Sequence, residues 1–395
     1  MRKLLVSTTA LALAAGTAAA DDHAVKIGIV LGFTGPIESL TPHMAAAAEM
    51  AMEEVSESGN LLDGKMVEPV RADSTCIDSG AATTAAERLV TSEGVKGIMG
   101  ADCSGVTGAV LSNVAVPNGV VMISPSATSP ALSTAEDDGL FFRTAPSDAR
   151  QGEVMAKILM ERGIEEVAVT YTNNDYGKGL ADSFASAYEE MGGTVTINAA
   201  HEDGKADYSA EVGALASAGG DRLVVAGYVD QGGSGVVRAA LDTGAFDTFH
   251  FPDGMIGTAL EENFGSAIDG STGQHPGTDS PGKAKFQEMV GDSFEATSPF
   301  APESYDAAAL MMLAMQAAGS PESADYKGHV MDVANAPGEK IFPGELGKAL
   351  EIIADGGDID YVGATAVELI GPGESAGNYR EIIFEDGEIT TVQYR

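Results

Sequence analysis

Short apolar runs alternate with helical stretches along the first 145 residues of the chain. Strands separated by helices of about ten residues indicate βαβ units, whose strands lie parallel in one sheet. Because helices cover both faces of such a sheet, its strands are buried and read as apolar runs. The pattern predicts an α/β fold with a doubly wound, mostly parallel sheet. Strands are expected at residues 25–33, 66–73, 95–99 and 120–124, and helices at 44–55 and 81–91.

The same alternation begins again after Arg143, without any repeat of the sequence itself. A chain of 395 residues also exceeds the size at which a single hydrophobic core stops growing. We therefore expect two Rossmann-like α/β lobes of similar size. In this second half, helices are expected at 148–160, 177–191, 209–217 and 235–242, and strands at 166–171, 194–199 and 222–226.

The last third of the chain departs from the alternation. Residues 269–283 are rich in Gly, Ser, Thr and Pro, which predicts a connection, and helices are expected at 304–318 and 343–354. Strands at 381–384 and 389–393 flank Asp386-Gly387, a strong hairpin signal. Because a terminal hairpin does not continue a βαβ series, the chain is expected to return to an earlier sheet and make the lobes discontinuous.

The N-terminus has the three parts of a signal peptide. Arg2 and Lys3 precede an apolar run at residues 4–15, and small residues end at Ala20, after which we place the cleavage. The run is too short to span a bilayer, and no cysteine stands at the cleavage point to carry a lipid. These features predict an exported, unanchored protein of a Gram-negative periplasm.

The net charge limits the classes of partner. It is −37, and the loss of Arg2 and Lys3 with residues 1–20 would change it to −39. Such a chain repels phosphates and anionic membrane surfaces, so neither nucleic acid nor a membrane surface is an expected partner. The acidity is compatible with a cationic ligand, but acidic residues spread over the whole length more often mark solubility.

The chain has two cysteines, Cys76 and Cys103. An exported protein folds in an oxidising compartment, so one disulfide between them is the simplest interpretation. A metal site is the weaker alternative, because no histidine clusters with either cysteine.

Three loops that follow predicted strands have similar compositions. Residues 32–36, 100–105 and 125–130 are small, hydroxyl-bearing and rich in glycine. Ligands of doubly wound sheets bind outside the carboxyl ends of the strands, where these loops lie. Free backbone N–H groups and hydroxyls suit an anion such as a carboxylate. The alternative is helix capping without a ligand, which Ser104 or Thr128 alone would satisfy.

The second half supplies a different set of candidates: Tyr176, Tyr228 and Asp253. Tyrosine offers an apolar face with a polar tip, and aspartate pairs with an ammonium group. Tyrosines at the rim of the core and an Asp-Gly turn would explain the same residues. Small donors in one lobe and aromatic and acidic groups in the other suit a zwitterion enclosed between the two.

Catalytic and metal-binding motifs are missing from the sequence. The six histidines show no paired ligand spacing, and G-x-S-x-G, P-loop and G-x-G-x-x-G motifs are absent. Residues 358–363 start like a calcium loop but place Val362 and Leu369 where oxygen ligands belong. We therefore expect neither an enzyme nor a bound cofactor or metal.

Together, these loops give the chain a family resemblance. It resembles the periplasmic leucine/isoleucine/valine-binding proteins of ABC transporters, which are type I periplasmic binding proteins, over nearly all of its length. The resemblance implies two lobes joined by a three-segment hinge: lobe 1 from residues 21–144 and about 274–360, lobe 2 from 145–273 and about 361–395. The matching landmarks are Gly32-x-Thr34-Gly35-Pro36, Cys103-Ser104, residues 124–130, Phe142-Arg143-Thr144, Asp175-Tyr176-Gly177-x-Gly179 and Ala226-Gly227-Tyr228.

The resemblance also implies roles for individual residues. Ser104 and Thr128, with the backbone of Ser126 in the Ser126-Ala127-Thr128 run, would hold a ligand carboxylate. Asp253 would meet the ammonium group, and Tyr176 and Tyr228 match the aromatic residues of lobe 2. The family's disulfide matches Cys76 and Cys103. Leu40 stands where an aromatic residue usually caps the side-chain pocket, and Asp253 where glutamate is common.

These departures leave the side chain of the ligand open. A branched-chain amino acid is the first expectation, and related carboxylates, amides, urea or aromatic acids are the alternatives. The expected partners are the permease subunits of an ABC transporter, to which a monomer would deliver its ligand. A detached sensor that reports the ligand to a membrane receptor is the competing interpretation.

Overall fold

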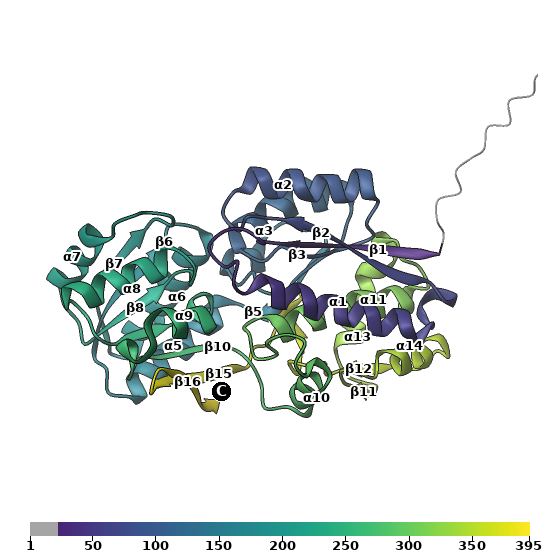
Figure 1. Ribbon diagram of the computed structural model, residues 1–395. Helices are drawn as coiled ribbons and strands as arrows, with labels where there is room; N and C mark the ends of the chain where they lie inside the picture. The colour runs from purple at the N-terminus through teal and green to yellow at the C-terminus, as the bar shows by residue number, and fades with distance from the viewer. Residues whose placement is uncertain (1–22) are drawn as a thin grey trace, which may run out of the picture.

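The computed structural model describes residues 23–395, so the predicted signal peptide lies outside the described residues. Within this range the strands form two seven-stranded sheets and one two-stranded sheet. The two large sheets lie at opposite ends of an elongated molecule, with helices packed around each of them (Figure 1). The prediction of two α/β lobes is confirmed.

The first sheet is parallel from β2 to β14, and β13 adds one antiparallel edge strand. Four of its strands coincide with predicted apolar runs, and the three that follow β1 each lie between helical segments in the chain. In spatial order the strands are β13 (Leu369–Ile370), β14 (Glu374–Ser375), β5 (Phe141–Pro146), β4 (Met122–Ser124), β3 (Ile98–Gly100), β1 (Ala24–Leu31) and β2 (Met66–Asp73).

Helices cover both faces of the first sheet (Figure 1). On one face α2 (Ser79–Arg88) packs on α3 (Ser104–Val110), and on the other α1 (Thr41–Ser58) packs on α11 (Ala301–Ala318). From Ala301 to Met315 nearly every residue of α11 is buried, because it lies between the sheet, α1 and the outer segments. The outer segments are α10 (Pro281–Val290), α12 (Ser323–Tyr326), α13 (Val330–Ala334), α14 (Leu346–Ala354) and the small sheet of β11 (Glu339–Ile341) and β12 (Ile359–Tyr361). The short α4 (Val116–Asn118) packs instead on residues 111–115, which follow α3.

The second sheet ends in the predicted hairpin, which pairs antiparallel with β10. Its strands, in spatial order, are β16 (Glu388–Tyr394), β15 (Tyr379–Glu385), β10 (Thr272–Pro276), β9 (Phe249–Phe251), β8 (Arg222–Ala226), β6 (Glu166–Thr172) and β7 (Thr194–His201). Its helices are α5 (Asp148–Glu161) and α6 (Asp175–Glu190), which pack together, α7 (Ser209–Ala218) and α8 (Gly232–Thr243), which also pack together, and α9 (Thr258–Phe264).

Three buried strands of the two large sheets were not predicted from the sequence: β10, β5 and β9, the last of which lies outside every predicted element. Residues 269–283 were expected to be a connection, but their middle forms β10, whose five residues are all buried. β10 has no apolar run because it consists of small and polar residues. Two of these buried polar side chains are paired by hydrogen bonds: the Thr272 hydroxyl accepts from Arg222, and Gln274 donates to Gln151. β5 was not predicted as a strand because Arg143 interrupts its apolar run.

The described chain crosses between the sheets three times, at 146–148, 276–281 and 375–379. We call the first sheet with its helices lobe 1 (residues 24–146 and 281–375) and the second with its helices lobe 2 (residues 148–276 and 379–394). The first crossing lies close to its predicted position and the second slightly later. The third corrects the expectation near residue 361, because β13 and β14 still belong to the sheet of lobe 1.

A buried ion pair anchors the first and third crossings to each other. Arg143 in β5 is 1% exposed and donates to Glu374 in β14 at 2.5 Å. The same guanidinium donates to the carbonyl oxygens of Ala127 and Ser129, at 3.0 and 2.9 Å. One side chain therefore joins the end of the β5 strand, the loop after β4 and the segment before the third crossing.

None of the helices formed by residues 23–395 is long and apolar enough to cross a membrane.

Loss of the Glu374 carboxylate should be far more costly than loss of a surface partner. In Glu374→Ala the Arg143 guanidinium stays buried without its counter-ion, so the free energy of unfolding should fall by about 3 kcal/mol. Glu322→Ala removes the partner of Lys96 from a pair whose side chains are 36% and 58% exposed, and should cost less than about 1 kcal/mol. Urea denaturation of the two variants checks the difference, and equal losses would contradict the anchoring role of Arg143.

Candidate ligand-binding site

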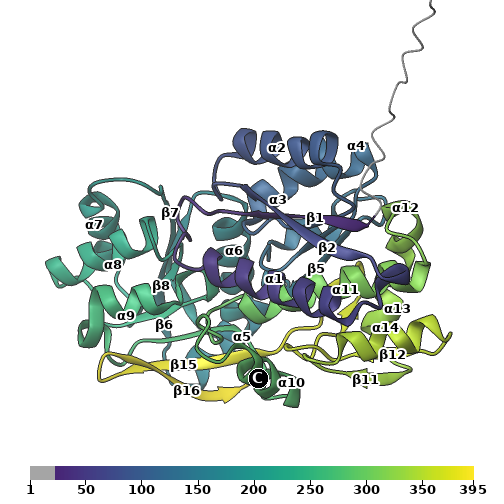
Figure 2. The ribbon, with the colours of Figure 1, turned by 45° about the vertical axis from the view of Figure 1, so that its right-hand side comes forward.

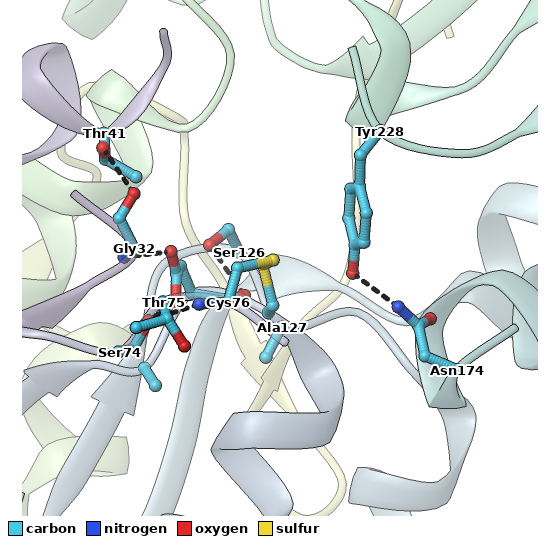
Figure 3. Close-up of a disulfide and its surroundings, with 12 residues drawn as sticks. Gly32, Thr41, Ser74, Thr75, Cys76, Ser126, Ala127, Asn174 and Tyr228 are labelled. Atoms are coloured by element: carbon cyan, nitrogen blue, oxygen red, sulfur yellow. Dashed lines mark hydrogen bonds between the residues drawn. A yellow bond between two sulfur atoms is a disulfide. The ribbon is translucent and has the colours of Figure 1, made fainter. Parts of the chain in front are cut away.

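The carboxyl ends of the parallel strands of both lobes face a common cavity of about 310 Å³. A parallel doubly wound sheet places its ligand-contacting loops at this edge. Figure 3 shows the lobe 1 part, with Cys76 and Ser126, opposite Tyr228 and Asn174 of lobe 2. The cavity is lined by Ile37, Leu40, Asp102, Cys103, Ser104, Ser126 and Phe300 from lobe 1 and by Tyr176, Tyr228, Asp253 and Gly254 from lobe 2.

The disulfide and Asp102 hold the lobe 1 loops together. Cys76, in the loop after β2, is bonded to Cys103, which directly precedes α3. The buried Asp102 carboxylate accepts hydrogen bonds from the Gly32 backbone at 2.5 Å and from the Ser74 hydroxyl at 2.7 Å. A side chain at Gly32 would lie 2.9 Å from Asp102, so this close approach requires glycine. Burial raises the pKa of Asp102.

Two of the predicted hydroxyl groups line the cavity. The Ser104 hydroxyl accepts from the Ser129 backbone at 3.1 Å, which leaves its proton free to be donated. Ser126 donates to the carbonyl oxygen of Asp102 at 3.0 Å and can accept in return. Both side chains belong to loops that the disulfide, Asp102 and Arg143 keep in place.

Thr128 and Ala127 do not line this cavity, although both are buried beside it. The Thr128 carbonyl oxygen accepts from the Asp148 backbone at the first crossing, at 2.8 Å. Its hydroxyl is buried and has no hydrogen-bond partner among the described residues. The expected pairing of Ser104 with Thr128 around one ligand group is therefore not seen here, and Ser126 takes the position beside Ser104.

The two tyrosines form the wall contributed by lobe 2. Their rings stack with centroids 5.1 Å apart, and the Tyr176 hydroxyl donates to Asp253 at 2.6 Å. Tyr176 stands in the first turn of α6, which Asn174 caps by accepting from the Gly177 backbone at 3.0 Å. The cap directs the Tyr176 ring toward the cavity, and Asn174 also donates to the Tyr228 hydroxyl at 3.4 Å.

Asp253 is 1% exposed and is held by neutral donors alone. Its carboxylate accepts from Tyr176, from the Gly254 backbone at 2.7 Å and from the Gln151 amide at 2.9 Å. Burial raises its pKa, and these hydrogen bonds oppose that rise. No lysine, arginine or histidine in residues 23–395 pairs with it as a salt bridge. A carboxylate accepts about four hydrogen bonds, so Asp253 keeps capacity for a donor in the cavity.

A second buried carboxyl group lies behind Asp253. The Gln151 amide donates to Asp148 at 2.7 Å as well as to Asp253, so it bridges the two. The pKa of Asp148 is well above its ordinary value, first because of burial and then because of the Asp253 charge. The bridge brings two buried carboxyl groups together beside the cavity, and the hydrogen bonds that Asp253 accepts favour its charged form.

Apolar side chains from lobe 1 close the remaining wall. Leu40 was predicted, whereas Ile37 and Phe300 were not. Phe300 directly precedes α11 and has a φ of 65°, a left-handed backbone conformation that is uncommon for an aromatic residue. Its position in the chain, 150 residues or more beyond the other lobe 1 loops, gives no local signal of a role in the cavity.

Backbone contacts join the two lobes at the rim. The Ser39 backbone donates to the Asp230 carboxylate at 2.8 Å, and the Asp230 backbone donates to the Pro36 carbonyl at 3.1 Å. These bonds connect the loop after β1 with the segment before α8. The lobes therefore touch on the side of the cavity away from the crossings.

The family model for periplasmic binding proteins matches residues 24–336. The Leu/Ile/Val-binding protein BraC3 of Rhizobium johnstonii is 30% identical over 82% of this chain and 87% of its own length. The Leu/Ile/Val-binding protein homolog 3 of Brucella melitensis is 35% identical over 59% of this chain and 62% of its own length. A chemotactic signal transduction system substrate-binding protein, BasB of Halobacterium salinarum, is 29% identical over 86% and 82%.

Solved structures share the fold at lower identity. A leucine-binding protein, LivK of Thermotoga maritima, superposes with a TM-score of 0.78 and 22% identity, covering 94% of this chain and 98% of that one. LivJ of Streptococcus pneumoniae, in complex with isoleucine, gives 0.77 and 21%, over 94% and 99%. A solute-binding protein of R. palustris in complex with benzoate gives 0.75 and 18%, over 94% and 96%.

Buried acids around the cavity should make the protein less stable as the pH rises. Burial raises the pKa of Glu303, at the start of α11, to about 8. Between about pH 5 and 8 this group is ionised in the unfolded chain and protonated in the folded one, so folding loses free energy with increasing pH. In Glu303→Gln the free energy of unfolding should fall less steeply over this window. Denaturation at several pH values checks this, with the exposed Glu68→Gln as the control for one lost charge; identical slopes for wild type and Glu303→Gln would contradict the assignment.

Proposed function

This chain belongs to the periplasmic binding protein family, and we propose that it is an extracytoplasmic receptor that captures an amino acid of the branched-chain type. The observation that carries the proposal is one small cavity that brings together hydroxyl donors, an unpaired carboxylate and an apolar wall. These three features are complementary to the carboxylate, the ammonium group and the aliphatic side chain of such a ligand. The protein binds and releases its ligand unchanged.

In this proposal the Ser104 hydroxyl and the backbone of Ser126 hold the ligand carboxylate, because the Ser126 hydroxyl already donates to the Asp102 carbonyl oxygen. Ser104 has a hydroxyl proton to donate, and the loop that carries Ser126 is fixed by the Arg143 guanidinium. Hydrogen bonds to a charged acceptor are stronger than neutral ones and set the orientation of the ligand. Thr128 joins this set only with a change of its loop, and its unpartnered hydroxyl gives it the capacity to do so.

The ligand ammonium group pairs with Asp253. The carboxylate is buried, and its present partners are a phenol, a backbone amide and a side-chain amide. An ammonium group would supply the counter-charge that this buried anion does not have. Because burial weakens screening, the pair discriminates strongly against ligands without a positive charge.

The side chain of the ligand packs against Leu40, Ile37 and Phe300. These three apolar side chains close one wall of the cavity, which suits an aliphatic group. The relatives named for Leu, Ile and Val support the aliphatic class, and the benzoate complex of a structural relative supports an aromatic acid as the alternative.

Binding and release require the lobes to separate. Lobe 1 carries the carboxylate donors and lobe 2 carries Asp253, so a ligand that contacts both favours the closed arrangement by its higher affinity for it. Rotation about the three crossings is the motion that would open the rim contacts at Asp230.

We further propose that the protein works in the periplasm as a monomer, after removal of residues 1–20, and passes its ligand to the permease subunits of an ABC transporter. The family of the chain and its relatives support transport. The similarity to BasB supports a second candidate, in which the closed form reports the ligand to a membrane receptor. Deletion of the cognate permease distinguishes transport from sensing. A transport receptor would no longer support uptake of the ligand, whereas a sensor would still support taxis toward it.

A thermal-shift screen of the purified protein tests the ligand class. Amino acids, amides and aromatic acids are added singly, and a saturating ligand raises the melting temperature through its preference for the folded state. We expect leucine, isoleucine or valine to give the largest rise. A larger rise with benzoate, or with 4-methylpentanoate in place of leucine, would contradict the role of the ammonium group.

Asp253→Asn should lower the affinity for the amino acid by at least about 30-fold, because a buried ion pair with the ligand is lost. Asp203→Asn is the control: Asp203 is a partly buried carboxylate of the same lobe that accepts from Thr172 and Gly232 and does not line the cavity. Isothermal titration measures both. Wild-type affinity in Asp253→Asn would refute the assignment of the ammonium partner.

A further inference from the structure

A second cavity, of about 400 Å³, lies where the second and third crossings meet. Its walls come from the end of β10, the start of α10, the loop before α11 and the strands β15 and β16. Figure 2 shows α10 beside the C-terminal end of β16, and the Lys283 ammonium group donates to the Tyr394 hydroxyl between them. Segments of both lobes thus enclose a space that the proposed amino-acid site does not use.

Two cations line this cavity in a strongly acidic chain. Lys283 lies over the Tyr394 ring, 4.6 Å from its centroid, and Arg380 donates through Nε to the Thr391 hydroxyl at 2.8 Å. In the described part of the chain, neither side chain forms a salt bridge. Their hydrogen-bond partners, Tyr394 and Thr391, are neutral, although the whole chain carries a net charge of −37.

The carboxyl groups nearby do not neutralise this pair. Glu303 lines the cavity, but burial raises its pKa to about 8, so it is protonated at neutral pH, and one of its oxygens has no hydrogen-bond partner. Glu261 and Glu295 face Arg380 from an adjoining cavity. Glu261 accepts from the Ile389 backbone and Glu295 from Thr297, and both carboxylates act on Arg380 through space rather than through a salt bridge.

A buried histidine points to a ligand independently of the two cations. His275 is 5% exposed. It lines both the second cavity at the crossings, which we call the hinge cavity, and the adjoining one. Neither of its ring nitrogens has a partner among the residues that the structure describes. Burial lowers its pKa to about 3, so the ring is neutral and offers one N–H donor and one acceptor. Unpaired polar atoms at such depth are rare unless something else occupies the space beside them.

We propose that this hinge cavity is a second ligand site, which binds a small oxyanion, either inorganic or an organic carboxylate, through Arg380, Lys283 and His275. Arg380 supplies the planar donor pair that oxyanions favour, Lys283 a point charge, and His275 one further donor. Lys283 belongs to lobe 1 and the other two residues to lobe 2. A bound anion therefore joins the lobes at the crossings and stabilises the arrangement seen here.

Thermal unfolding of the full chain tests the site. Inorganic phosphate, sulfate, acetate or succinate replaces chloride at constant ionic strength, so that general screening stays the same. We expect at least one of these anions to raise the melting temperature with a saturable concentration dependence. Stabilisation by phosphate or sulfate alone assigns an inorganic ligand, and stabilisation by acetate or succinate alone assigns an organic carboxylate.

Variants locate the effect. Arg380→Gln and Lys283→Gln should each raise the dissociation constant of the stabilising anion by about tenfold or more. Arg222→Gln is the matched control, since Arg222 is a largely buried arginine of lobe 2 that donates to a threonine hydroxyl outside the cavity. Asp253→Asn should keep the anion response, which separates this site from the amino-acid site.

A measurement on the unmodified protein covers the case in which these variants do not fold. With ¹⁵N-labelled histidine, the ring nitrogens of His275 should shift as the anion is added, while those of His250, buried in lobe 2 outside the cavity, should not. Equal melting shifts with every anion in wild type and in Arg380→Gln, or no shift of the His275 resonances, would overturn the proposal.

Discussion

The buried guanidinium of Arg143 is the interaction on which the arrangement of this protein depends. It pairs with Glu374 from a segment more than 200 residues later, and it holds the carbonyl oxygens on both sides of Thr128. A buried cation is tolerated only with a counter-charge and satisfied donors. The binding loop after β4, the end of β5 and the third crossing are therefore positioned by one requirement, the neutralisation of Arg143.

The charges inside the molecule are distributed unevenly around the crossings. The proposed amino-acid site has a buried carboxylate, Asp253, and no cation, whereas the hinge cavity has Lys283 and Arg380 and a protonated Glu303. Each site thus has charged side chains without a counter-ion in the site, and burial raises the free-energy cost of an unpaired charge. The two sites thus differ in the charge of the group that would satisfy them, an ammonium group in one and an oxyanion in the other.

Sequence reasoning recovered the parts of the fold that depend on apolar runs and turns. The β1, β2, β4, β6 and β8 strands and the terminal hairpin lie where alternation and the Asp386-Gly387 turn place them. It missed β10, which is buried through hydrogen bonds of Thr272 and Gln274, and β5, because a charged residue inside an apolar run reads as a break. Such strands need a partner elsewhere in the chain, which local patterns do not reveal.

Local sequence patterns also predicted only part of the binding site. Strand-end loops and the family landmarks led to Ser104, Ser126, Tyr176, Tyr228, Asp253 and Leu40, and the structure brings these around one cavity. Asp102 was passed over because its role is to hold Gly32 and Ser74 in place, and Phe300 because it arrives from a distant loop. Thr128 was included because its loop has the right composition, but its carbonyl oxygen accepts from Asp148 at the first crossing and its side chain does not line the cavity.

The three crossings have a consequence for the order in which the protein can be completed during synthesis. Residues 24–146 emerge first and contain most of the first sheet, yet they do not contain α11, which covers one face of it, or Glu374. Lobe 2 likewise lacks its edge hairpin until the last residues are made. Neither lobe can therefore finish folding as an independent N-terminal unit: lobe 1 needs residues 281–375 and lobe 2 needs residues 379–394.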